Sequence, residues 1–317
     1  MNKEKIIPIL KGLLSNIPIL SRLSSPAPTG GTNNSRYCYT VWMRHLIAAN
    51  KNGLQNIPHT IAEFGPGDSI GMGLAALLSG GERYYALEVY KYWDTERNVQ
   101  IFDELVELFR NRTDVPGADE FPKVVPVAED YSFPSHILTN EHLEKCLDKE
   151  RLEEIRNELL NPEINEGKNY IKYFIPWYDK KIAETATVDF IVSQGALQYV
   201  ENIDETYAAM NSWLKPGGFM SHVIDFSSHL ITKKWNAHWT FSDFEWKLVK
   251  GKKILRLNRA PLSEHLALNE KHRFKVLQVN AYSKDSELTF DQFANGYTPL
   301  IETDITVRAG FIQSKKQ

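Results

Sequence analysis

Two glycines in the segment Glu63-Phe64-Gly65-Pro66-Gly67 could bring the backbone close to a bound ligand. Glycine adopts positive φ and has no Cβ, so a turn built on it permits close approach. The apolar residues before Glu63 predict a strand, and the pattern after Ser69 predicts a helix that Asp68 or Ser69 could cap. The N–H groups at such a helix end carry partial positive charge. A strand–turn–helix corner of this kind is where open α/β sheets bind nucleotides.

The residues around the turn restrict the type of nucleotide. The dinucleotide fingerprint requires a third glycine at position 70, where the chain has Ile70. A phosphate loop requires Gly-Lys-Ser or Gly-Lys-Thr, and neither tripeptide occurs in the chain. The pattern Glu63–Gly67 instead resembles the first motif of the class I S-adenosylmethionine-dependent methyltransferases. The resemblance implies S-adenosylmethionine as cofactor and S-adenosylhomocysteine as product, bound by Glu63, Gly65, Gly67, Asp68 and Ser69.

Carboxylates follow two further apolar runs. Glu88 stands 88 − 67 = 21 residues after Gly67, at the end of the run 84–87. A carboxylate about 20 residues after the glycine turn can accept hydrogen bonds from the ribose hydroxyls. The run 123–128 predicts a third strand that leads into Glu129 and Asp130. In the family that the turn resembles, an acidic residue there meets the adenine amino group, although each of these acids could equally face water.

Two later segments also resemble this family. Residues 188–200 indicate a buried strand, a loop and the start of a helix over 203–214. Residues 213–219 place Pro-Gly-Gly between that helix and a fifth strand. We therefore expect a doubly wound, seven-stranded, mostly parallel α/β sheet with an antiparallel seventh strand. The loop after the fourth strand would bring Ser193 to the cofactor and Gln194 and Tyr199 to the substrate.

The loop after strand four departs from the family pattern in one respect. Tyr199 stands where many relatives carry histidine, and Ser193 and Gln194 are poor bases. A general base must then come from elsewhere, and histidine is the natural candidate near neutral pH. Asp225 could orient such a histidine. The catalytic candidates around the fifth strand are His222, His229, His238 and Asp225.

Those four residues could also form a metal site, since imidazole and carboxylate are suitable ligands. However, His222 and Asp225 are an odd number of residues apart on one strand and would face opposite sides of the sheet. We therefore expect no metal. Aromatic side chains in the insertions are candidates for substrate binding, namely Trp177, Trp235 and Trp239. A basic run from Lys247 to Arg259 is either a solvated face or a surface that attracts an anionic substrate.

The predicted domain organisation is an N-terminal helical arm or lid over residues 1–59 and a methyltransferase domain over 60–317. Insertions into that domain are expected at 131–187 and 227–272.

The N-terminal segment 1–23 is rich in Ile and Leu, but Pro8, Lys11 and Pro18 interrupt it, which argues against a signal peptide. It could be an arm, a lid over the cofactor, or a contact with a membrane surface or a partner. Residues 24–35 read as a hinge. In the helix predicted after it, Arg36 could pair with the cofactor carboxylate and Tyr39 could cover its sulfonium, or Tyr39 could be part of a packed apolar stripe.

The composition is that of a soluble globular protein, with 317 residues of which 42% are hydrophobic and 24% charged. A net charge of −3 argues against general nucleic-acid binding. No apolar run approaches the roughly 20 residues of a membrane span. Cys38 and Cys146 form neither a disulfide framework nor a zinc-ligand spacing, which is typical of a reducing cytoplasm.

The sequence predicts a methyltransferase that acts on a small molecule. The block 214–229 with residues 235–240 resembles bacterial methyltransferases of glycan and specialised-metabolite pathways, so O-methylation of a sugar or glycan precursor is the first expectation. The runner-up is O- or N-methylation of an apolar specialised metabolite. A non-catalytic cofactor-binding partner protein is a third possibility. A nicotinamide-dependent dehydrogenase is a rival that Ile70 disfavours. Nothing in the sequence indicates the oligomeric state.

Overall fold

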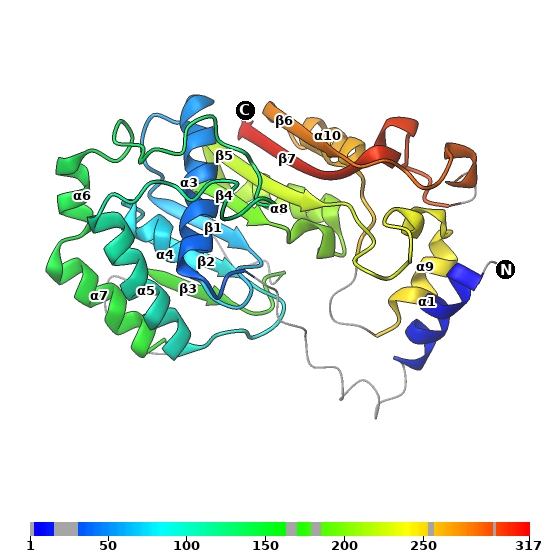
Figure 1. The fold of residues 1–317 in the computed structure, drawn as a ribbon, viewed down its shortest axis with the longest axis horizontal. Helices are drawn as coiled ribbons and strands as arrows, with labels where there is room; N and C mark the ends of the chain where they lie inside the picture. The colour runs from blue at the N-terminus through cyan, green and yellow to red at the C-terminus, as the bar shows by residue number, and fades with distance from the viewer. Residues whose placement is uncertain (1–2, 16–30, 163–169, 179–184, 253–256, 294–295) are drawn as a thin grey trace.

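The computed structural model describes residues 3–15, 31–162, 170–178, 185–252, 257–293 and 296–317. Its centre is a seven-stranded sheet in the order β3-β2-β1-β4-β5-β7-β6 (Figure 1). Strands β1 to β5 run parallel, and β7 is antiparallel to both β5 and β6. The predicted doubly wound, seven-stranded sheet with an antiparallel last strand is confirmed. The strands are β1 Thr60–Phe64, β2 Arg83–Leu87, β3 Ile171–Phe174, β4 Val188–Gln194, β5 Leu214–Asp225, β6 Phe274–Ser283 and β7 Val307–Lys316.

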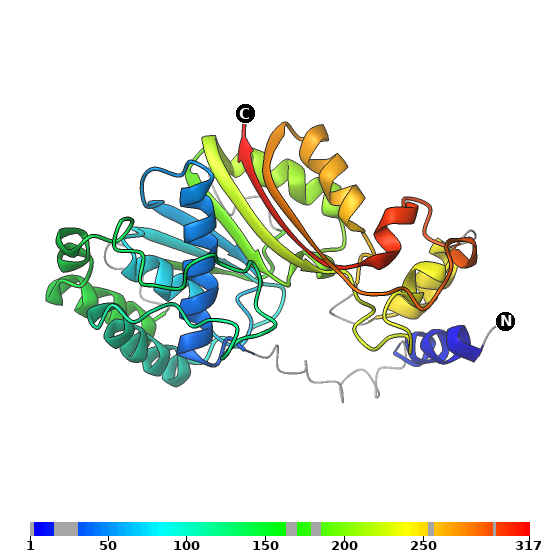
Figure 2. The same cartoon turned by 45° about the horizontal axis from the view of Figure 1, so that its top comes forward.

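Helices cover both faces of the sheet (Figures 1 and 2). Every residue of β1 is buried, as expected for a parallel strand in the middle of such a sheet. Its side chains alternate, so that Ile61 belongs to one hydrophobic cluster and Ala62 and Phe64 to another. The first face carries α3 Ser35–Lys51, α4 Gly71–Leu78 and α5 Thr95–Arg110, and the second carries α8 Ile203–Trp213 and α10 Leu262–Lys271.

The third strand is not where the sequence predicted it. Residues 121–130 form turns and bends, and β3 is Ile171–Phe174, paired parallel with β2. Pro126 lies in the middle of the predicted run, and proline cannot donate a hydrogen bond to a strand ladder. Tyr173 and its neighbours have the aromatic and β-branched side chains that suit a strand.

The first insertion therefore spans 111–170, between α5 and β3, instead of the predicted 131–187. It contains α6 Asn140–Cys146 and α7 Lys149–Leu160, which lie outside α4 and α5 (Figure 1).

The second insertion follows β5 and ends at residue 261, earlier than the predicted 272, because α10 packs on β6 and β7 as part of the sheet layer. It contains the short helix η2 Ala237–Thr240 and α9 Asp243–Lys250. Further short helices are η1 Leu197–Tyr199 after β4, and η3 Phe290–Phe293 and η4 Glu302–Thr306 between β6 and β7.

The N-terminal helix α1 Lys3–Leu14 packs against α9, at the end of the molecule formed by the second insertion (Figure 2). Lys5 Nζ lies 2.7 Å from Glu245 Oε2, and the Gly12 Cα lies close to the backbone of residues 248 and 249. The expected lid over the glycine turn is thus not observed. Most of the predicted hinge, residues 24–30, lies outside the described residues.

Candidate active site

The glycine turn, residues 65–67, follows β1 at the carboxyl end of the parallel sheet. Gly65 has a φ of 64° and Gly67 a φ of 77°, in the left-handed region that favours glycine. A Cβ added to Gly65 would lie 2.7 Å from Ala196 Cβ, in the loop after β4. The turn therefore requires glycine both for its conformation and for its close approach to that loop.

The start of α4 differs in detail from the sequence prediction. The helix begins at Gly71 with Ile70 as N-cap, and neither Asp68 nor Ser69 occupies the cap position. Ser69 Oγ nevertheless accepts a hydrogen bond from Gly71 N (3.0 Å), and Asn98 Oδ1 accepts one from Ile70 N (3.1 Å). Ser69 Oγ also donates to the carbonyl of Thr32, so the segment before α3 lies over this helix end.

Glu88 lies at the end of β2 and faces the glycine turn, as predicted. It is 5% exposed, and its Oε1 lies 3.4 Å from Gly67 N while its Oε2 accepts a hydrogen bond from Val89 N (2.9 Å). Burial raises the pKa of Glu88 above its usual value, and the bonds from backbone N–H groups oppose that shift. Tyr92, in the loop that follows, has a pKa raised to about 12 by burial and then by the carboxylates of Glu88 and Asp68.

Glu63 belongs to the turn motif but points into the protein. Tyr84 Oη donates to Glu63 Oε2 (2.5 Å), and the residue is 2% exposed. Burial raises the pKa of Glu63 to about 8. The predicted contact of this carboxylate with the cofactor is not supported, because the carboxylate is hydrogen bonded to Tyr84 of β2, on the face of the sheet that α3, α4 and α5 cover.

Alternation along β4 and β5 separates two polar groups that the sequence analysis placed in one site. Ser193 Oγ and His222 Nδ1 lie 2.9 Å apart, and both residues are fully buried. Gln194 and Ser221 face the other side of the sheet, where His45 Nε2 lies 3.1 Å from Gln194 Oε1 and His45 Nδ1 lies 2.7 Å from Ser221 Oγ. Burial lowers the pKa of His222 to about 3, and this residue is closed off from any ligand.

Three candidate residues do come together at the carboxyl ends of β4 and β5. Tyr199 Oη lies 3.0 Å from His229 Nδ1, and His229 Nε2 lies 3.9 Å from Asp225 Oδ2. The His229 and Asp225 side chains are 27% and 33% exposed, so this cluster borders solvent. Burial, with Asp225 and Tyr92 nearby, raises the pKa of Tyr199 to about 12, which keeps its hydroxyl protonated. Tyr92 thus links this cluster to Glu88 and the glycine turn.

A narrow recess lies beside the cluster, between the end of β5 and the segment 257–260 of the second insertion. We call it the acceptor recess. It is lined by Gln198, Asp225, Phe226, His238, Trp239, Leu257, Asn258, Arg259 and Ala260. His238 is stacked on Trp239, with ring centroids 4.5 Å apart, and burial lowers its pKa well below the usual value. The prediction of His238 as a base is therefore not supported, since a fully buried imidazole cannot exchange protons with solvent.

Trp239 and Trp235, both predicted to bind substrate, are buried within the second insertion. Trp239 Nε1 donates to the carbonyl of Arg259 (2.7 Å), and Trp239 lines the acceptor recess. Trp235 Nε1 donates to the carbonyl of Asp285 (3.0 Å), and its ring packs on Trp239. Trp235 is therefore part of the hydrophobic core and not of the recess.

Other predicted site residues lie elsewhere. Arg36 Nη2 lies 2.6 Å from Glu120 Oε2, and Tyr39 is buried against Phe109 with its hydroxyl donating to Thr113. Both positions follow from α3, which turns Tyr39 toward α5 and leaves Arg36 at the rim of the insertion.

Glu129 and Asp130 do not follow a third strand, so the strand position on which their predicted contact with adenine depended is wrong. Glu129 Oε1 lies 2.5 Å from Lys51 Nζ, and Asp130 Oδ1 accepts a hydrogen bond from Ser132 N. Trp177 instead comes directly after β3. Its backbone N donates to the carbonyl of Glu88 (2.9 Å), and its ring meets Phe64 edge-on, which places it by the cofactor corner and not by the acceptor.

Sequence reasoning gave no individual role to Tyr92 in the loop after β2, to Gln198 in η1 or to Arg259 in the second insertion. Arg259 carries the clearest signal in retrospect, as the last cation of a basic run that ends in the apolar stretch 260–262. Tyr37, at the start of α3, has a pKa raised to about 12, chiefly by burial.

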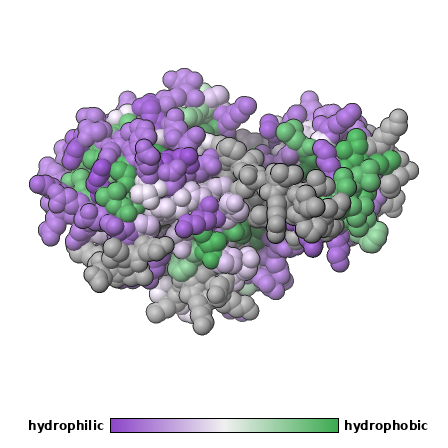
Figure 3. Space-filling model, turned by 90° about the horizontal axis from the view of Figure 1, so that it is seen from below, coloured by the Kyte–Doolittle hydropathy of each residue, from purple (hydrophilic) through white to green (hydrophobic). Residues whose placement is uncertain are grey.

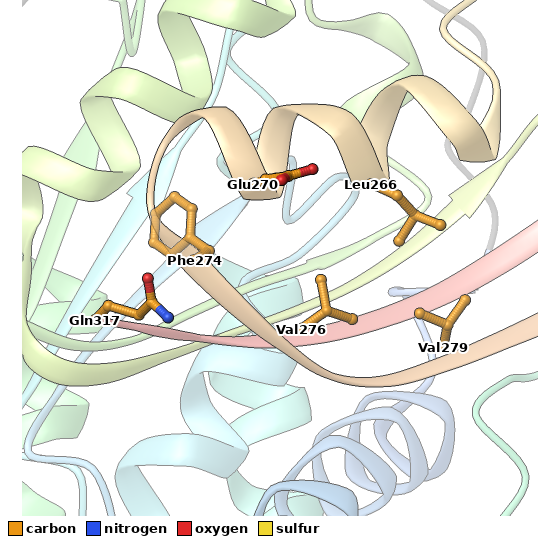
Figure 4. A pocket seen from close by; sticks show the side chains of 6 residues that line it. All are labelled: Leu266, Glu270, Phe274, Val276, Val279 and Gln317. Atoms are coloured by element: carbon orange, nitrogen blue, oxygen red, sulfur yellow. The ribbon is translucent and has the colours of Figure 1, made fainter.

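Within the described residues, no three or more His, Cys, Asp or Glu side chains are grouped so as to hold a metal ion. A separate hollow of about 450 Å³ lies between α10 and the edge strand β6 (Figure 4). Its lining residues are Leu266, Glu270, Phe274, Val276, Val279 and Gln317. This hollow has only two polar side chains and lies two strands beyond β5, so it does not suit the predicted chemistry.

The strand order, the antiparallel β7 and the glycine turn after β1 define the architecture. The fold is that of the class I methyltransferases. No protein-family model matches the chain, and no curated protein sequence matches it.

The solved structures that resemble it include a phosphoethanolamine N-methyltransferase from Haemonchus contortus, with 13% identity over 87% of this chain and 52% of that chain (TM-score 0.42). The chain thus spans about half the length of that protein. A methyltransferase from Methanosarcina mazei has 12% identity over 84% and 96% (TM-score 0.43). A putative sarcosine dimethylglycine methyltransferase from Galdieria sulphuraria has 12% identity over 87% and 85% (TM-score 0.44).

Proposed function

We propose that this protein is an S-adenosylmethionine-dependent methyltransferase that acts on a small molecule. The observation that carries the proposal is the corner at the carboxyl ends of β1 and β2. There, Gly65 and Gly67 have positive φ, Gly65 approaches the β4 loop, and the buried Glu88 carboxylate lies 3.4 Å from Gly67 N. A carboxylate in this position can accept two ribose hydroxyls, and glycines, which have no Cβ, admit the methionyl chain.

The cofactor supplies an activated methyl group, and the protein must align an acceptor with it and exclude water. Positioning of this kind is worth roughly 7–11 kcal/mol of the barrier. The acceptor would lie over the ends of β4 and β5, next to the cluster of Tyr199, His229 and Asp225. Tyr92 connects this cluster to the cofactor corner, because its electrostatic neighbours are Glu88 and Asp68 on one side and Tyr199 on the other.

His229 is the proposed general base. When its Nδ1–H donates to Tyr199 Oη, Nε2 keeps a lone pair; this atom is buried and has no hydrogen-bond partner among the described residues, and it could take the proton of an acceptor hydroxyl that reaches it. Asp225, 3.9 Å from Nε2, then stabilises the imidazolium. His222 and His238 are buried and cannot fill this role, so His229 is the only one of the three predicted histidines that we retain as a base.

The acceptor that we propose first is a sugar or glycan-precursor hydroxyl. A hydroxyl needs a base, and the Tyr199–His229–Asp225 cluster supplies one, whereas an amine would depend on it less. The runner-up is an apolar specialised metabolite. The buried position of Trp235 weakens that alternative, because this ring packs in the hydrophobic core and not at the recess.

Transfer of labelled methyl from S-adenosylmethionine to a panel of sugars, phenols and amines tests this function. We expect label in hydroxylated acceptors with the wild type and none with His229→Ala, while His59→Ala, an exposed histidine near the start of β1, behaves as wild type. Cofactor binding without transfer to any acceptor would favour the non-catalytic alternative. Binding of NAD in preference to S-adenosylmethionine would favour a dehydrogenase.

The N-terminal helix is a separate proposal for a contact surface. The side of α1 turned away from α9 exposes Ile7, Leu10, Leu13 and Leu14, and Figure 3 shows apolar residues gathered at this end of the molecule. Lys11 and Lys247 lie exposed on the same two helices. No helix among the described residues is long and apolar enough to cross a membrane. We propose peripheral contact with an anionic surface. Vesicle co-sedimentation that is unchanged in Leu10→Ser/Leu14→Ser would contradict it.

A further inference from the structure

The acceptor recess contains buried polar atoms that the protein itself does not satisfy. Among the described residues, Gln198 Oε1, His238 Nδ1 and Arg259 Nε have no hydrogen-bond partner, although the three residues are only 3%, 1% and 4% exposed. All three residues line the recess. Buried polar groups are nearly always hydrogen bonded, so three unpaired atoms around one recess need an explanation.

The local packing shows that these side chains are held in place and not merely unsatisfied by chance. Arg259 is sandwiched between the rings of Trp246 and Tyr297, at 5.0 Å and 4.6 Å from their centroids. Its Nη1 donates to the carbonyl of Phe241, and its φ of 74° lies in the left-handed region that is rare outside glycine. Such strain is concentrated at binding sites. Gln198 is held by its Nε2, which donates to the carbonyl of Gly195 (2.8 Å).

The charges around the recess exclude an anionic ligand group. Arg259 Nη2 already pairs with Asp243 Oδ1 at 2.5 Å, which balances its charge, and Asp225 adds an unbalanced carboxylate to the lining. An anion would be repelled there. Lys250 Nζ, in the basic run, lies 3.4 Å from Glu201 Oε1. This ion pair weakens the prediction that the basic run attracts an anionic substrate.

The unpaired atoms match a neutral ligand that both donates and accepts hydrogen bonds. Gln198 Oε1 can only accept and Arg259 Nε can only donate, while neutral His238 Nδ1 can do either. Hydroxyl groups on adjacent carbons of a ring offer both donors and acceptors. We propose that the acceptor recess binds a neutral, hydroxyl-bearing ring through Gln198, His238 and Arg259.

This inference deepens the proposed function, because it names the class of acceptor. That the bound ring is methylated rests on the proposed function, whereas binding of the ring does not. The recess has no space for a water molecule in the closed arrangement. Ligand binding must therefore move the segment 257–260 away from β5. The three unpaired atoms favour such opening, since they gain partners only when the segment moves.

The test uses the full chain without cofactor, so that it does not depend on methyl transfer. Saturation-transfer NMR and calorimetry would measure binding of glucose, galactose and mannose. Cyclohexanol serves as a comparison ring without vicinal hydroxyls, and glucuronate serves as a charged comparison ring. We expect at least one hexose to bind at millimolar concentration and both comparison compounds to bind about tenfold more weakly or not at all.

Two isosteric variants, His238→Phe and Gln198→Met, separate a ligand role from a structural one. Each is expected to weaken hexose binding about tenfold. His238→Phe should leave the melting temperature unchanged or higher, because it removes a buried polar atom without a partner, whereas Gln198→Met also loses the hydrogen bond from Nε2 to the carbonyl of Gly195 and should melt slightly lower. His265→Phe is the matched control, since its Nδ1 lies 3.1 Å from Tyr207 Oη. It should lose stability and keep binding.

Three results would overturn the inference: no hexose binds, glucuronate binds more tightly than the hexoses, or His238→Phe destabilises the protein and leaves binding intact. Hexose binding together with failure to bind S-adenosylmethionine would leave this inference standing and refute the proposed function.

Discussion

The cofactor corner and the acceptor recess differ in how their polar groups are used. At the corner, Glu88 accepts hydrogen bonds from backbone N–H groups, and Ser69 accepts one from the first residue of α4. In the recess, polar atoms of Gln198, His238 and Arg259 have no partner among the described residues. Beside the corner, Tyr92 Oη and Asn98 Nδ2 also have no partner in the described part of the chain. The glycine turn and Glu88 are nevertheless preorganised, whereas the recess reaches its best hydrogen bonding only with a ligand present.

This contrast fits the two tasks. A cofactor of fixed shape is best bound by a rigid turn on strands of the central sheet, which costs little to order. An acceptor site built by an insertion after β5 can change independently of the sheet. The difference predicts that substitutions at the corner alter cofactor affinity, whereas substitutions near the recess alter turnover or acceptor binding and leave cofactor affinity intact.

The largest effect is expected for His229→Ala on the acceptor side. Loss of a general base lowers turnover by about 10²–10⁴-fold. The dissociation constant of S-adenosylmethionine should stay within about twofold, because His229 does not contact the corner. Steady-state kinetics and calorimetry on the same preparation measure both quantities. A cofactor affinity that falls in parallel with turnover would abolish the distinction between the two regions.

Gly65→Ala tests the corner itself. The new Cβ would lie 2.7 Å from Ala196 Cβ at a φ of 64°, so the turn must shift, and we expect cofactor affinity to fall about a hundredfold. Gly53→Ala is the matched control, because Gly53 has a φ of 98° but nothing lies within 4 Å of an added Cβ. It carries the conformational cost without the contact. Equal cofactor affinity in the two variants would show that the turn does not approach the ligand.

Tyr199→Phe is expected to have a smaller effect, about tenfold on turnover. The hydroxyl only orients His229 and selects its tautomer, so removing it leaves the base in place. The acidic limb of the pH–rate profile should shift while the cofactor dissociation constant does not change. A loss as large as that of His229→Ala would instead make Tyr199 a direct participant.

The smallest effect concerns Glu63 beneath the corner. Its pKa is raised to about 8 in the folded state from a usual value near 4.5, so the folded protein holds this proton more tightly than the unfolded chain. The resulting stabilisation is present at low pH and is lost as the pH rises through about 8. Glu63→Gln should therefore melt near the wild-type temperature at pH 5 and several degrees above it at pH 8.5.

Glu82→Gln provides the matched control for that melting series, because its side chain is 66% exposed at the protein surface, where its Oε1 lies 2.9 Å from His59 Nδ1. It should show no such pH trend. A constant difference between Glu63→Gln and wild type across this range would mean that Glu63 is ionised in the folded state.

The sequence predicted the corner well because its determinants are local. Glycine at 65 and 67, and an acid 21 residues later, follow from the geometry of one strand–turn–helix unit. The fold class followed from the order along the chain of the glycine turn, Glu88, the run 123–128 and the segments 188–200 and 213–219. The misplaced third strand shows the limit of this approach: the run around Pro126 and the true β3 are both short and apolar, and only pairing with β2 distinguishes them.

The recess could not be predicted in the same way. Gln198 and Arg259 come from segments far apart in the chain. The sequence indicated only that Arg259 belongs to a basic run, whereas in the structure it packs between two aromatic rings. The burial of His222 and His238 likewise depends on which side of β5 and of η2 faces the core. His229 and Asp225 lie close together at the end of β5, as the sequence suggested, and their catalytic roles stay predictions.

Calorimetric titration with S-adenosylmethionine of the wild type, Glu88→Gln and the control Glu82→Gln tests the central claim most directly. The proposed cofactor corner predicts micromolar binding by the wild type and by Glu82→Gln, and at least tenfold weaker binding by Glu88→Gln. Binding that is absent in the wild type, or equal in all three proteins, would contradict the assignment of the glycine turn 65–67 and Glu88 as the cofactor site.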